Sequence, residues 1–474
     1  MAFAPADLKK HRIRALRGSR LYQRGQTIDL VLQEGTAKVA DETAAHPRRQ
    51  GEPHANLVLA MLLLVYVFNF LDRMILSILA KPIQQDLGLS DGQMGMLGGI
   101  AFAVLYSTLA VPLSSLADRT SRSWVVAISL FAWSGFTALC GLAQSFWHIF
   151  LARVGVGVGE AGGVAPSYAI IGDYFPPRRR ATALAIYSLG IPLGSAIGLL
   201  AGGFIAETVN WRAAFVAIGV AGVVLAPIFK WIVRDLPRTI AAEEKDRVAP
   251  PEVRALDVAK SLARKPAFWL LSLGAAAGSS IGYGISFWLP SFVQRSFGLG
   301  LFDTAVFVAA TLLTGGVAGV LSGGWLADRL GQGNRAWYAW LPALAYVIGA
   351  PLWAAGVASA SPVAAFLLIL IPQGLGFFWL GPVLTAVQHL VEPAARATAS
   401  ALFLLINNLI GLAAGIYALG ALSDALTPLY GDEALRMSII WSLGLYGLAG
   451  LFMAFAGFAL RRGWVDERVH LSRD

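Results

Sequence analysis

The chain has 474 residues, of which 57% are hydrophobic and 14% are charged, and its mean hydropathy is +0.64. Soluble domains carry about 25% charged residues, so this composition excludes an ordinary soluble domain and indicates a membrane protein. The formal net charge of +9 is spread over many short polar segments, which favours contact with anionic membrane lipids over nucleic-acid binding. The single cysteine, Cys140, lies in an apolar stretch, so neither disulfide nor zinc chemistry is indicated.

The N-terminal segment, residues 1–54, differs from the rest of the chain. It begins with the basic stretch KKHRIRALRGSR, continues with polar residues, and lacks the apolar core of a signal peptide. We expect residues 1–54 to form a disordered cytoplasmic tail or a surface helix that adds attraction to the membrane surface.

Twelve apolar stretches follow, each long enough to cross a bilayer as a helix. They run too continuously for the alternating strands of an outer-membrane barrel. The predicted fold is therefore all-α and membrane-spanning, with six helices in residues 55–234 and six in 265–462, a cytoplasmic linker over 235–264 and a cytoplasmic tail over 463–474. The approximate stretches are 56–80, 93–116, 123–143, 147–174, 183–206, 211–233, 266–292, 304–326, 336–357, 362–390, 398–422 and 434–460.

Two tetrapeptides recur at nearly the same offset. LADR at Leu116–Arg119 returns at Leu326–Arg329, an offset of 210, and RATA at Arg180–Ala183 returns at Arg396–Ala399, an offset of 216. The recurrence predicts a duplication in which the halves are related by pseudo-symmetry. Duplicated halves of a membrane bundle usually bracket a binding site that is exposed alternately to the two sides.

The basic residues predict the orientation. Arginines concentrate in alternate loops, including Arg119, Arg122, 178–180 and Arg329, whereas the other loops hold few basic residues. By the positive-inside rule, both termini are expected in the cytoplasm of a multi-pass protein of the plasma (bacterial inner) membrane.

Four ionisable residues lie inside two predicted spans: Asp72 and Arg73 in the first, and Arg153 and Glu160 in the fourth. A charge at the bilayer centre costs about 2.5 to 3.5 kcal/mol on insertion scales, so such residues are usually paired and functional. Counting along the helices puts Asp72 and Arg153 at similar depth. Asp72 and Arg73 are about 100° apart on their helix and must address different partners.

These four residues have a structural and a functional interpretation. They could be an ion-pair network that only joins the first and fourth spans. We favour proton coupling, since desolvation raises the proton affinity of a buried carboxylate, a nearby arginine lowers it, and a change of partner then binds or releases a proton. Glu160 is the first candidate for the proton-coupling group and Asp72 the second. Arg73 and Arg153 are candidate counter-charges or anchors for an anionic headgroup.

Other motifs indicate little chemistry. The glycines of GVGVGEAGG follow no strand, so a dinucleotide site is not supported, and Gly190, Gly194 and Gly198 are spaced as a stripe for helix packing. The chain lacks GxxxxGK[ST], HExxH and CxxC, and no nucleophile and base occur at usable spacing. We therefore expect neither enzymatic activity nor a metal or cofactor. For uphill transport, the expected energy source is a gradient.

Several motifs of the sequence resemble those of a known family. The loop at Asp118, Arg119 and Arg122 and its counterpart GGWLADRLG, with Asp328 and Arg329, are similar to the signature loop of the major facilitator superfamily. Within it, FNFLDR at Phe68–Arg73, RVGVGVGEAG at Arg153–Gly162 and the following APSYAIIGDYFPPRRRATALAIY resemble the spinster family of lysolipid and sphingosine-phosphate transporters. The loop departs from the family pattern at Ser114 and Ser121, where glycines are usual.

The resemblance implies a gradient-linked carrier of amphiphiles that uses the same four charged residues. It also implies that spans 1, 4, 7 and 10 line a central cavity, which adds substrate-contact candidates Tyr283, Trp288, Gln373, Trp379 and Gln388. Each of these side chains could equally be an ordinary packing residue. The loop residues Asp118, Arg119, Arg122, Asp328 and Arg329 would form a conformational latch, with Asp118 facing the start of span eleven, unless these are merely solvated loop charges.

The sequence thus predicts a monomeric, proton-coupled secondary active transporter that moves an amphiphilic, anionic, lipid-like molecule by alternating access. One alternative is a drug or organic-anion exporter of the same fold. Another is a lipid scramblase or membrane sensor, neither of which needs a titrating carboxylate.

Overall fold

Residues 54–236 and 255–464 are described by a computed structural model, and within these ranges the chain is helical and contains no strand. Most of the predicted N-terminal tail, linker residues 237–254 and tail residues 465–474 lie outside the described residues.

The first half contains six membrane crossings, several of them divided into two helices. In chain order these are α3 with the short α4, then α5–α6, α7, α8–α9, α10–α11 and α12. Their bounds are α3 Ala55–Ile78, α4 Ala80–Leu87, α5 Asp91–Gly98, α6 Ile100–Arg119, α7 Arg122–Cys140, α8 Phe146–Glu160, α9 Val164–Tyr174, α10 Pro177–Ser188, α11 Gly190–Thr208 and α12 Trp211–Ile232.

The second half repeats this plan after the short helix α14, Ala255–Ala263. Crossings eight and eleven each contain a π-helical segment, η1 Leu312–Gly316 and η3 Asn408–Ala414. The remaining helices are α15 Pro266–Phe297, α16 Leu301–Thr311, α17 Val317–Gly331, α18 Trp337–Ala358, α19 Pro362–Leu375, α20 Leu380–Gln388, α21 Arg396–Asn407, α22 Gly415–Tyr430, α23 Ala434–Ser442 and α24 Gly444–Gly463, with 3-10 turns η2 Pro393–Ala395 and η4 Gly431–Glu433.

Eleven helical stretches in the described residues are long and apolar enough to span a membrane. The last of them, Arg396–Arg461, is 66 residues long and holds two crossings, α21–α22 and α23–α24, because the chain turns at η4, where Gly431 has a positive φ of 54°. The prediction of twelve transmembrane helices in two halves is confirmed.

Polar residues between the apolar stretches begin several of these helices. Ser90 caps α5 in a capping box with Gln93, and Asn210 caps α12 by accepting a hydrogen bond from the Ala213 amide at 2.8 Å. Such caps satisfy amides at a helix N-terminus that have no partner within the helix.

A stripe of glycines on α11 packs closely against α3. A Cβ atom at Gly194 would clash with the carbonyl oxygen of Val67, and one at Gly198 would lie 2.6 Å from that of Leu71. Side chains at these positions would push the two helices apart, so the predicted role of the glycine stripe in packing is confirmed.

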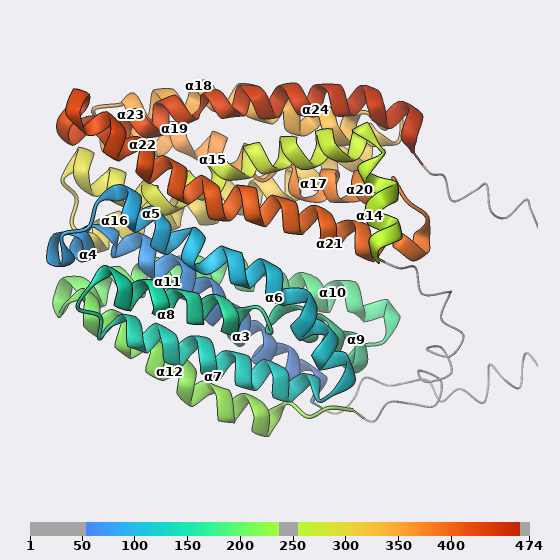
Figure 1. Cartoon of the computed structure of the whole chain (residues 1–474), viewed down its shortest axis with the longest axis horizontal. Coiled ribbons are helices and arrows are strands. Elements are labelled where there is room, and N and C mark those ends of the chain that lie inside the picture. Colours follow the sequence, from blue (N-terminus) through green and yellow to red (C-terminus); the bar gives the residue numbers. More distant parts are fainter. Residues whose placement is uncertain (1–53, 237–254, 465–474) are drawn as a thin grey trace, which may run out of the picture. The chain divides into compact units, whose positions relative to one another are not determined.

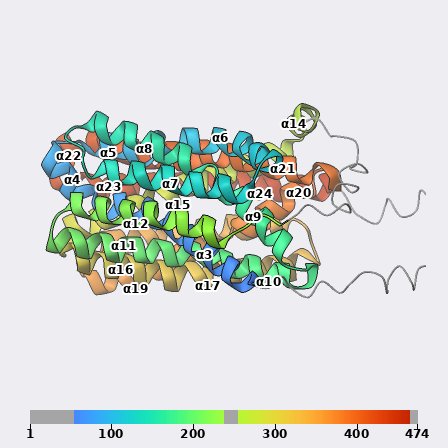
Figure 2. The same cartoon turned by 90° about the horizontal axis from the view of Figure 1, so that it is seen from below.

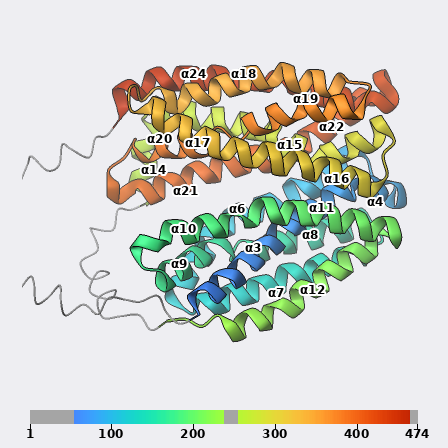
Figure 3. The same cartoon turned by 180° about the vertical axis from the view of Figure 1, so that it is seen from behind.

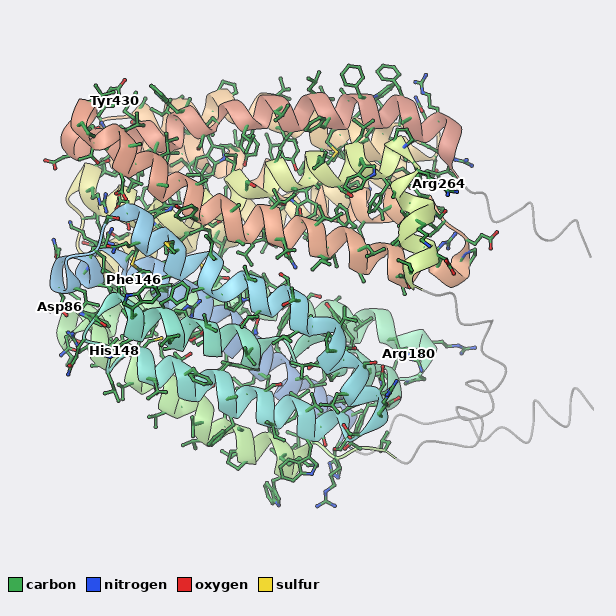
Figure 4. The ribbon with its side chains drawn as sticks, in the orientation of Figure 1. Asp86, Phe146, His148, Arg180, Arg264 and Tyr430 are labelled. Atoms are coloured by element: carbon green, nitrogen blue, oxygen red, sulfur yellow. The ribbon has the colours of Figure 1, made fainter. Side chains whose placement is uncertain are left out.

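The two halves lie side by side (Figure 1), with their helices running along a common axis (Figures 1 and 2). Figure 4 labels Asp86 at one end of this axis and Arg180 at the other, and we name these the Asp86 end and the Arg180 end. At the Asp86 end, α5 lies against α22 (Figure 2) and α11 lies against α16 (Figure 3).

Candidate functional site

The first ion pair of the site joins span one to span four. Arg153 on α8 donates a hydrogen bond to Asp72 on α3 at 3.1 Å, and both side chains are 2% exposed. Thr137 on α7 donates a second hydrogen bond to Asp72. The similar depth that helix geometry predicts for Asp72 and Arg153 is thereby confirmed, and three crossings meet at this carboxylate.

The second pair lies beside the first. The Nε and Nη2 atoms of Arg73 lie 2.9 and 2.8 Å from Oε2 of Glu160. Glu160 is fully buried, whereas the Arg73 side chain is 15% exposed. The other oxygen of Glu160, Oε1, has no hydrogen-bond partner among the described residues. Asp72 and Arg73 therefore pair with different residues, as the angle of about 100° between them on the helix predicts.

Aromatic rings surround the arginines. The guanidinium of Arg73 lies 4.5 Å from the ring centroid of Tyr106, 4.8 Å from that of Phe102 and 5.1 Å from that of Phe70. The guanidinium of Arg153 lies 5.3 Å from the Phe102 ring. Ring faces attract cations within about 6 Å, so both arginines keep favourable contacts besides their carboxylates.

Glycine lets the helices that carry these groups approach one another. Gly157 lies between Arg153 and Glu160 on α8, and a Cβ atom there would clash with the carbonyl oxygen of Phe102 on α6. The charged residues and the Phe102 ring are thus brought together because α8 presents no side chain at this position.

Span four breaks immediately after Glu160. Helix α8 ends there, a turn follows in which the Gly163 amide donates to the Glu160 carbonyl at 3.0 Å, and α9 begins at Val164. Span ten breaks in the same way between α19 and α20, beginning at Gly376, whose offset from Glu160 equals that between the RATA segments. Interrupted helices at corresponding positions of the two halves are typical of substrate sites in transporters.

The candidates in the second half have varied surroundings. Trp288 is fully buried, and its indole donates to the Ile416 carbonyl at 3.0 Å. Gln388 donates to Ser400 at 3.1 Å. Gln373 and Trp379 are buried, and Tyr283 is partly buried. Trp288 and Gln388 therefore have bonds within the protein, and the predicted substrate contacts of all five remain predictions.

The loop candidates lie near the Arg180 end. Asp118 accepts a hydrogen bond from Arg122 at 3.0 Å, and Arg122 also pairs with Asp173 on α9 at 2.7 Å. In the second half, the guanidinium of Arg329 lies 5.4 Å from the Trp325 ring. These pairs of Asp118 and Arg122 are thus formed within the first half, and a latch to span eleven remains a prediction.

Ser121, which departs from the usual glycine, has a local role. It caps α7 by accepting from the Trp124 amide at 3.2 Å, and it donates to Asp235 at the end of span six. The Ser123 amide donates to the same carboxylate at 2.9 Å. Burial raises the pKa of Asp235, but the hydrogen bonds from Ser121 and Ser123 outweigh it and hold this pKa below its ordinary value.

Sequence reasoning missed four residues of the site: Thr137, Phe70, Phe102 and Tyr106. Each is of a type that is common in membrane helices, and no spacing marks it. Within residues 54–236 and 255–464, no group of three or more His, Cys, Asp and Glu side chains could hold a metal ion.

Comparison with known proteins adds three findings. The model of the Major Facilitator Superfamily matches residues 62–416. A curated MFS-type efflux pump of Mycolicibacterium smegmatis is 33% identical over 426 residues, covering 89% of this chain and 97% of that protein. Protein spinster homolog 1 of Bos taurus is 28% identical over 439 residues, covering 86% of this chain and 81% of that protein.

Solved structures agree with the fold. The crystal structure of a bacterial homologue of the human lysosomal transporter spinster, inward-facing and unoccupied, matches with a TM-score of 0.79 and 28% identity, covering 88% of this chain and 99% of that one. Its inward-facing, occupied form matches with a TM-score of 0.74. A D-xylose-proton symporter, 17% identical with a TM-score of 0.63, shares the fold.

Proposed function

Because this chain belongs to the Major Facilitator Superfamily and is spinster-like, we propose that it is a proton-coupled secondary active transporter of an amphiphilic, anionic lipid. The proposed substrate class comprises lysolipids and sphingosine-phosphate-like molecules, which combine one anionic headgroup with one long alkyl chain. Transport proceeds by alternating access of the site between the two halves.

The observation that carries the proposal is the contact between Arg73 and Glu160. Two of the three guanidinium nitrogens of Arg73, Nε and Nη2, share one oxygen of a fully buried carboxylate whose second oxygen has no partner among the described residues. A proton bound at Glu160 cancels the charge that holds Arg73. The partly exposed guanidinium is then available to an anionic headgroup, which binds arginine by paired hydrogen bonds.

The second pair keeps the site assembled during this exchange. Arg153 and Asp72 are both buried, and Thr137 adds a further hydrogen bond to the carboxylate. Removing either member of a buried pair leaves an uncompensated charge at a cost of about 3 to 5 kcal/mol. Because Arg153 and Thr137 both stabilise the charged form of Asp72, Asp72 is only the second candidate for proton coupling, and Arg153 is its counter-charge.

We further propose that the Arg180 end faces the cytoplasm of a plasma membrane and that the protein acts as a monomer. The basic loops gather at this end, and a twelve-helix bundle can bury its own polar groups. In this orientation the halves are in contact at the outer end, since Ser77 on α3 donates to the Phe287 carbonyl on α15 at 2.6 Å and Arg295 pairs with Asp91 at 2.6 Å.

The test is uptake of labelled lysophospholipid and sphingosine phosphate into proteoliposomes with and without a pH gradient. We expect gradient-stimulated uptake that Glu160→Gln abolishes. Glu433→Gln is the matched control, because Glu433 lies in a loop segment and pairs with Arg436 three residues later. Uptake that neither the gradient nor Glu160→Gln changes would contradict proton coupling and favour a scramblase, whereas pH-independent ligand binding without uptake would favour a sensor.

A second function is favoured by one observation: the 33% identical relative is an MFS-type efflux pump. The same charged site would serve a drug or organic anion with less alkyl surface. Competition distinguishes the two functions, because a hydrophilic organic anion that displaces lysolipid at equal concentration supports the exporter.

A further inference from the structure

Two carboxylates at the Asp86 end cross from one half of the protein to the other. Asp424 on α22 accepts hydrogen bonds from the amides of Asp91 and Gly92 at 3.0 and 2.8 Å. Glu207 on α11 accepts a hydrogen bond from the amide of Phe302 at 2.6 Å. Asp91 and Gly92 begin α5, and Phe302 lies in the first turn of α16.

Each of these contacts has the same physical basis. The first amides of a helix lack partners within the helix, and the helix dipole places partial positive charge there. A carboxylate from the opposite half satisfies both needs only while the halves are together at this end. All three hydrogen bonds are therefore lost when the Asp86 end opens.

The repeat in the sequence relates the two contacts to each other. Phe302 follows Gly92 at the same offset that separates the two LADR segments, and Asp424 follows Glu207 at an offset one position longer than that of the RATA segments. Asp424, near the end of span eleven, caps the helix that begins span two. Its counterpart Glu207, at the end of span five, caps the helix that begins span eight. Duplication has thus produced one contact twice, with the halves exchanged.

The same pairs of helices carry acidic residues at the Arg180 end. Asp118 lies near the end of span two, and Asp328 lies near the end of span eight. The helices that begin spans eleven and five at this end are α21 and α10. In this structure Asp118 pairs with Arg122 of its own half.

We propose that Glu207 and Asp424 form a two-part latch that holds the Asp86 end closed, as the counterpart of a latch formed by Asp118 and Asp328 when the Arg180 end closes. The inference rests on the proposed alternation of access. Each latch joins span two to span eleven and span five to span eight. One latch acts at the Asp86 end and the other at the Arg180 end, so closing one requires opening the other.

The two parts of the latch differ in strength. Around the Asp424 contact, Arg295 pairs with Asp91 at 2.6 Å, and Ser423 donates to Asp91 at 2.6 Å. At the other contact, Gly300 lies near Glu207, since a Cβ atom there would be 3.3 Å from its carboxylate. Because Asp424 accepts hydrogen bonds from two amides and Glu207 from one, Asp424 should contribute more to closure than Glu207.

The test measures distances between spin labels in the full-length protein, with Cys140 replaced by Ala. Cysteines at Val209 and Leu429 report on the Asp86 end, since these side chains are 65% and 75% exposed. Cysteines at the exposed positions Arg179 and Glu392 report on the Arg180 end. We expect Glu207→Gln with Asp424→Asn to lengthen the first distance and shorten the second, and Asp424→Asn alone to do so more than Glu207→Gln alone.

Two further variants sharpen the test. Gly92→Ala keeps every charge but places a Cβ atom 2.7 Å from the Asp424 carboxylate, so it should act like Asp424→Asn. Asp303→Asn, an exposed carboxylate next to Phe302, should leave both distances unchanged.

Adding Asp118→Asn and Asp328→Asn to the double variant should move the distances back toward those of the native chain, because the competing latch is then weakened too. Unchanged distances in the double variant, or an equal effect of Asp303→Asn, would overturn the proposal. The distances require neither substrate nor a proton gradient. A failed transport assay therefore leaves the latch standing, and a failed latch leaves the transport proposal standing.

Discussion

The guanidinium of Arg73 lies 4.8 Å from the ring centroid of Phe102, whose ring also lies 5.3 Å from the guanidinium of Arg153. One buried ring on α6 therefore contacts the cations of both ion pairs. Because the ring carries no charge, its contact with Arg73 need not depend on whether Glu160 holds a proton.

Replacing Phe102 with Leu tests this role. Leucine fills most of the space but lacks the ring face, so the change should remove about 0.5 to 2 kcal/mol of cation–π attraction per arginine. We expect weaker binding of anionic amphiphiles and some loss of protein stability, measured by ligand titration beside thermal unfolding. Phe215, another fully buried ring of the first half, provides the control: Phe215→Leu should leave ligand affinity as it is.

The Asp72–Arg153 pair should behave as a unit. Arg153→Met leaves Asp72 buried without its counter-charge and should destabilise the protein by about 3 to 5 kcal/mol. Adding Asp72→Asn should recover much of this loss, because no unpaired charge then remains. Thermal unfolding in detergent of the two single variants and the double variant gives the coupling energy, and additive losses would show that the pair does not act as a unit.

The glycine stripe on α11 sets the distance between α11 and α3. Gly198→Ala places a Cβ atom 2.6 Å from the Leu71 carbonyl oxygen and should cost about 1 to 3 kcal/mol through overpacking. Gly135→Ala is the control, since its Cβ atom would meet nothing within 4 Å and alanine is favoured over glycine in helices. Unfolding temperatures should fall for the first variant and stay or rise for the second.

Asp235 should make stability depend on pH. Its pKa is lowered in the folded protein by hydrogen bonds from Ser121 and Ser123, against the effect of burial. As the pH falls, Asp235 therefore binds a proton at a higher pH in the unfolded chain than in the folded protein. The stabilisation is fully present above the unfolded pKa of about 3.9 and is lost as the pH falls through the folded pKa. Asp235→Asn should flatten this acid limb in unfolding measured from about pH 6 to about pH 3, and an unchanged limb would contradict the assignment.

Much of the architecture could be predicted because it depends on local composition. Long apolar stretches report spans directly, and two short repeats report the duplication. The pairing of Asp72 with Arg153 was also predictable, because helix rise converts sequence position into depth once the ends of a span are known.

The remainder depends on contacts between distant segments. Thr137 reaches Asp72 from a third helix, and nothing in its own neighbourhood marks it. The contacts of Glu207 and Asp424 at the Asp86 end likewise join segments 95 and 332 positions apart, so their partners emerge only when the halves are placed together. The helix break after Glu160 was missed because the same glycines also suit close helix packing.

The interruption of spans four and ten at corresponding positions has a consequence for how the copies have diverged. At the offsets of the two repeats, the counterpart of Arg73 is Tyr283 and the counterpart of Glu160 is Gly376. Both copies thus keep the interruption, while Arg73 and Glu160 have no charged counterparts at these positions. The two copies are therefore alike in where the helix is interrupted and unlike in charge, so the ionisable residues of the candidate site come from the first half.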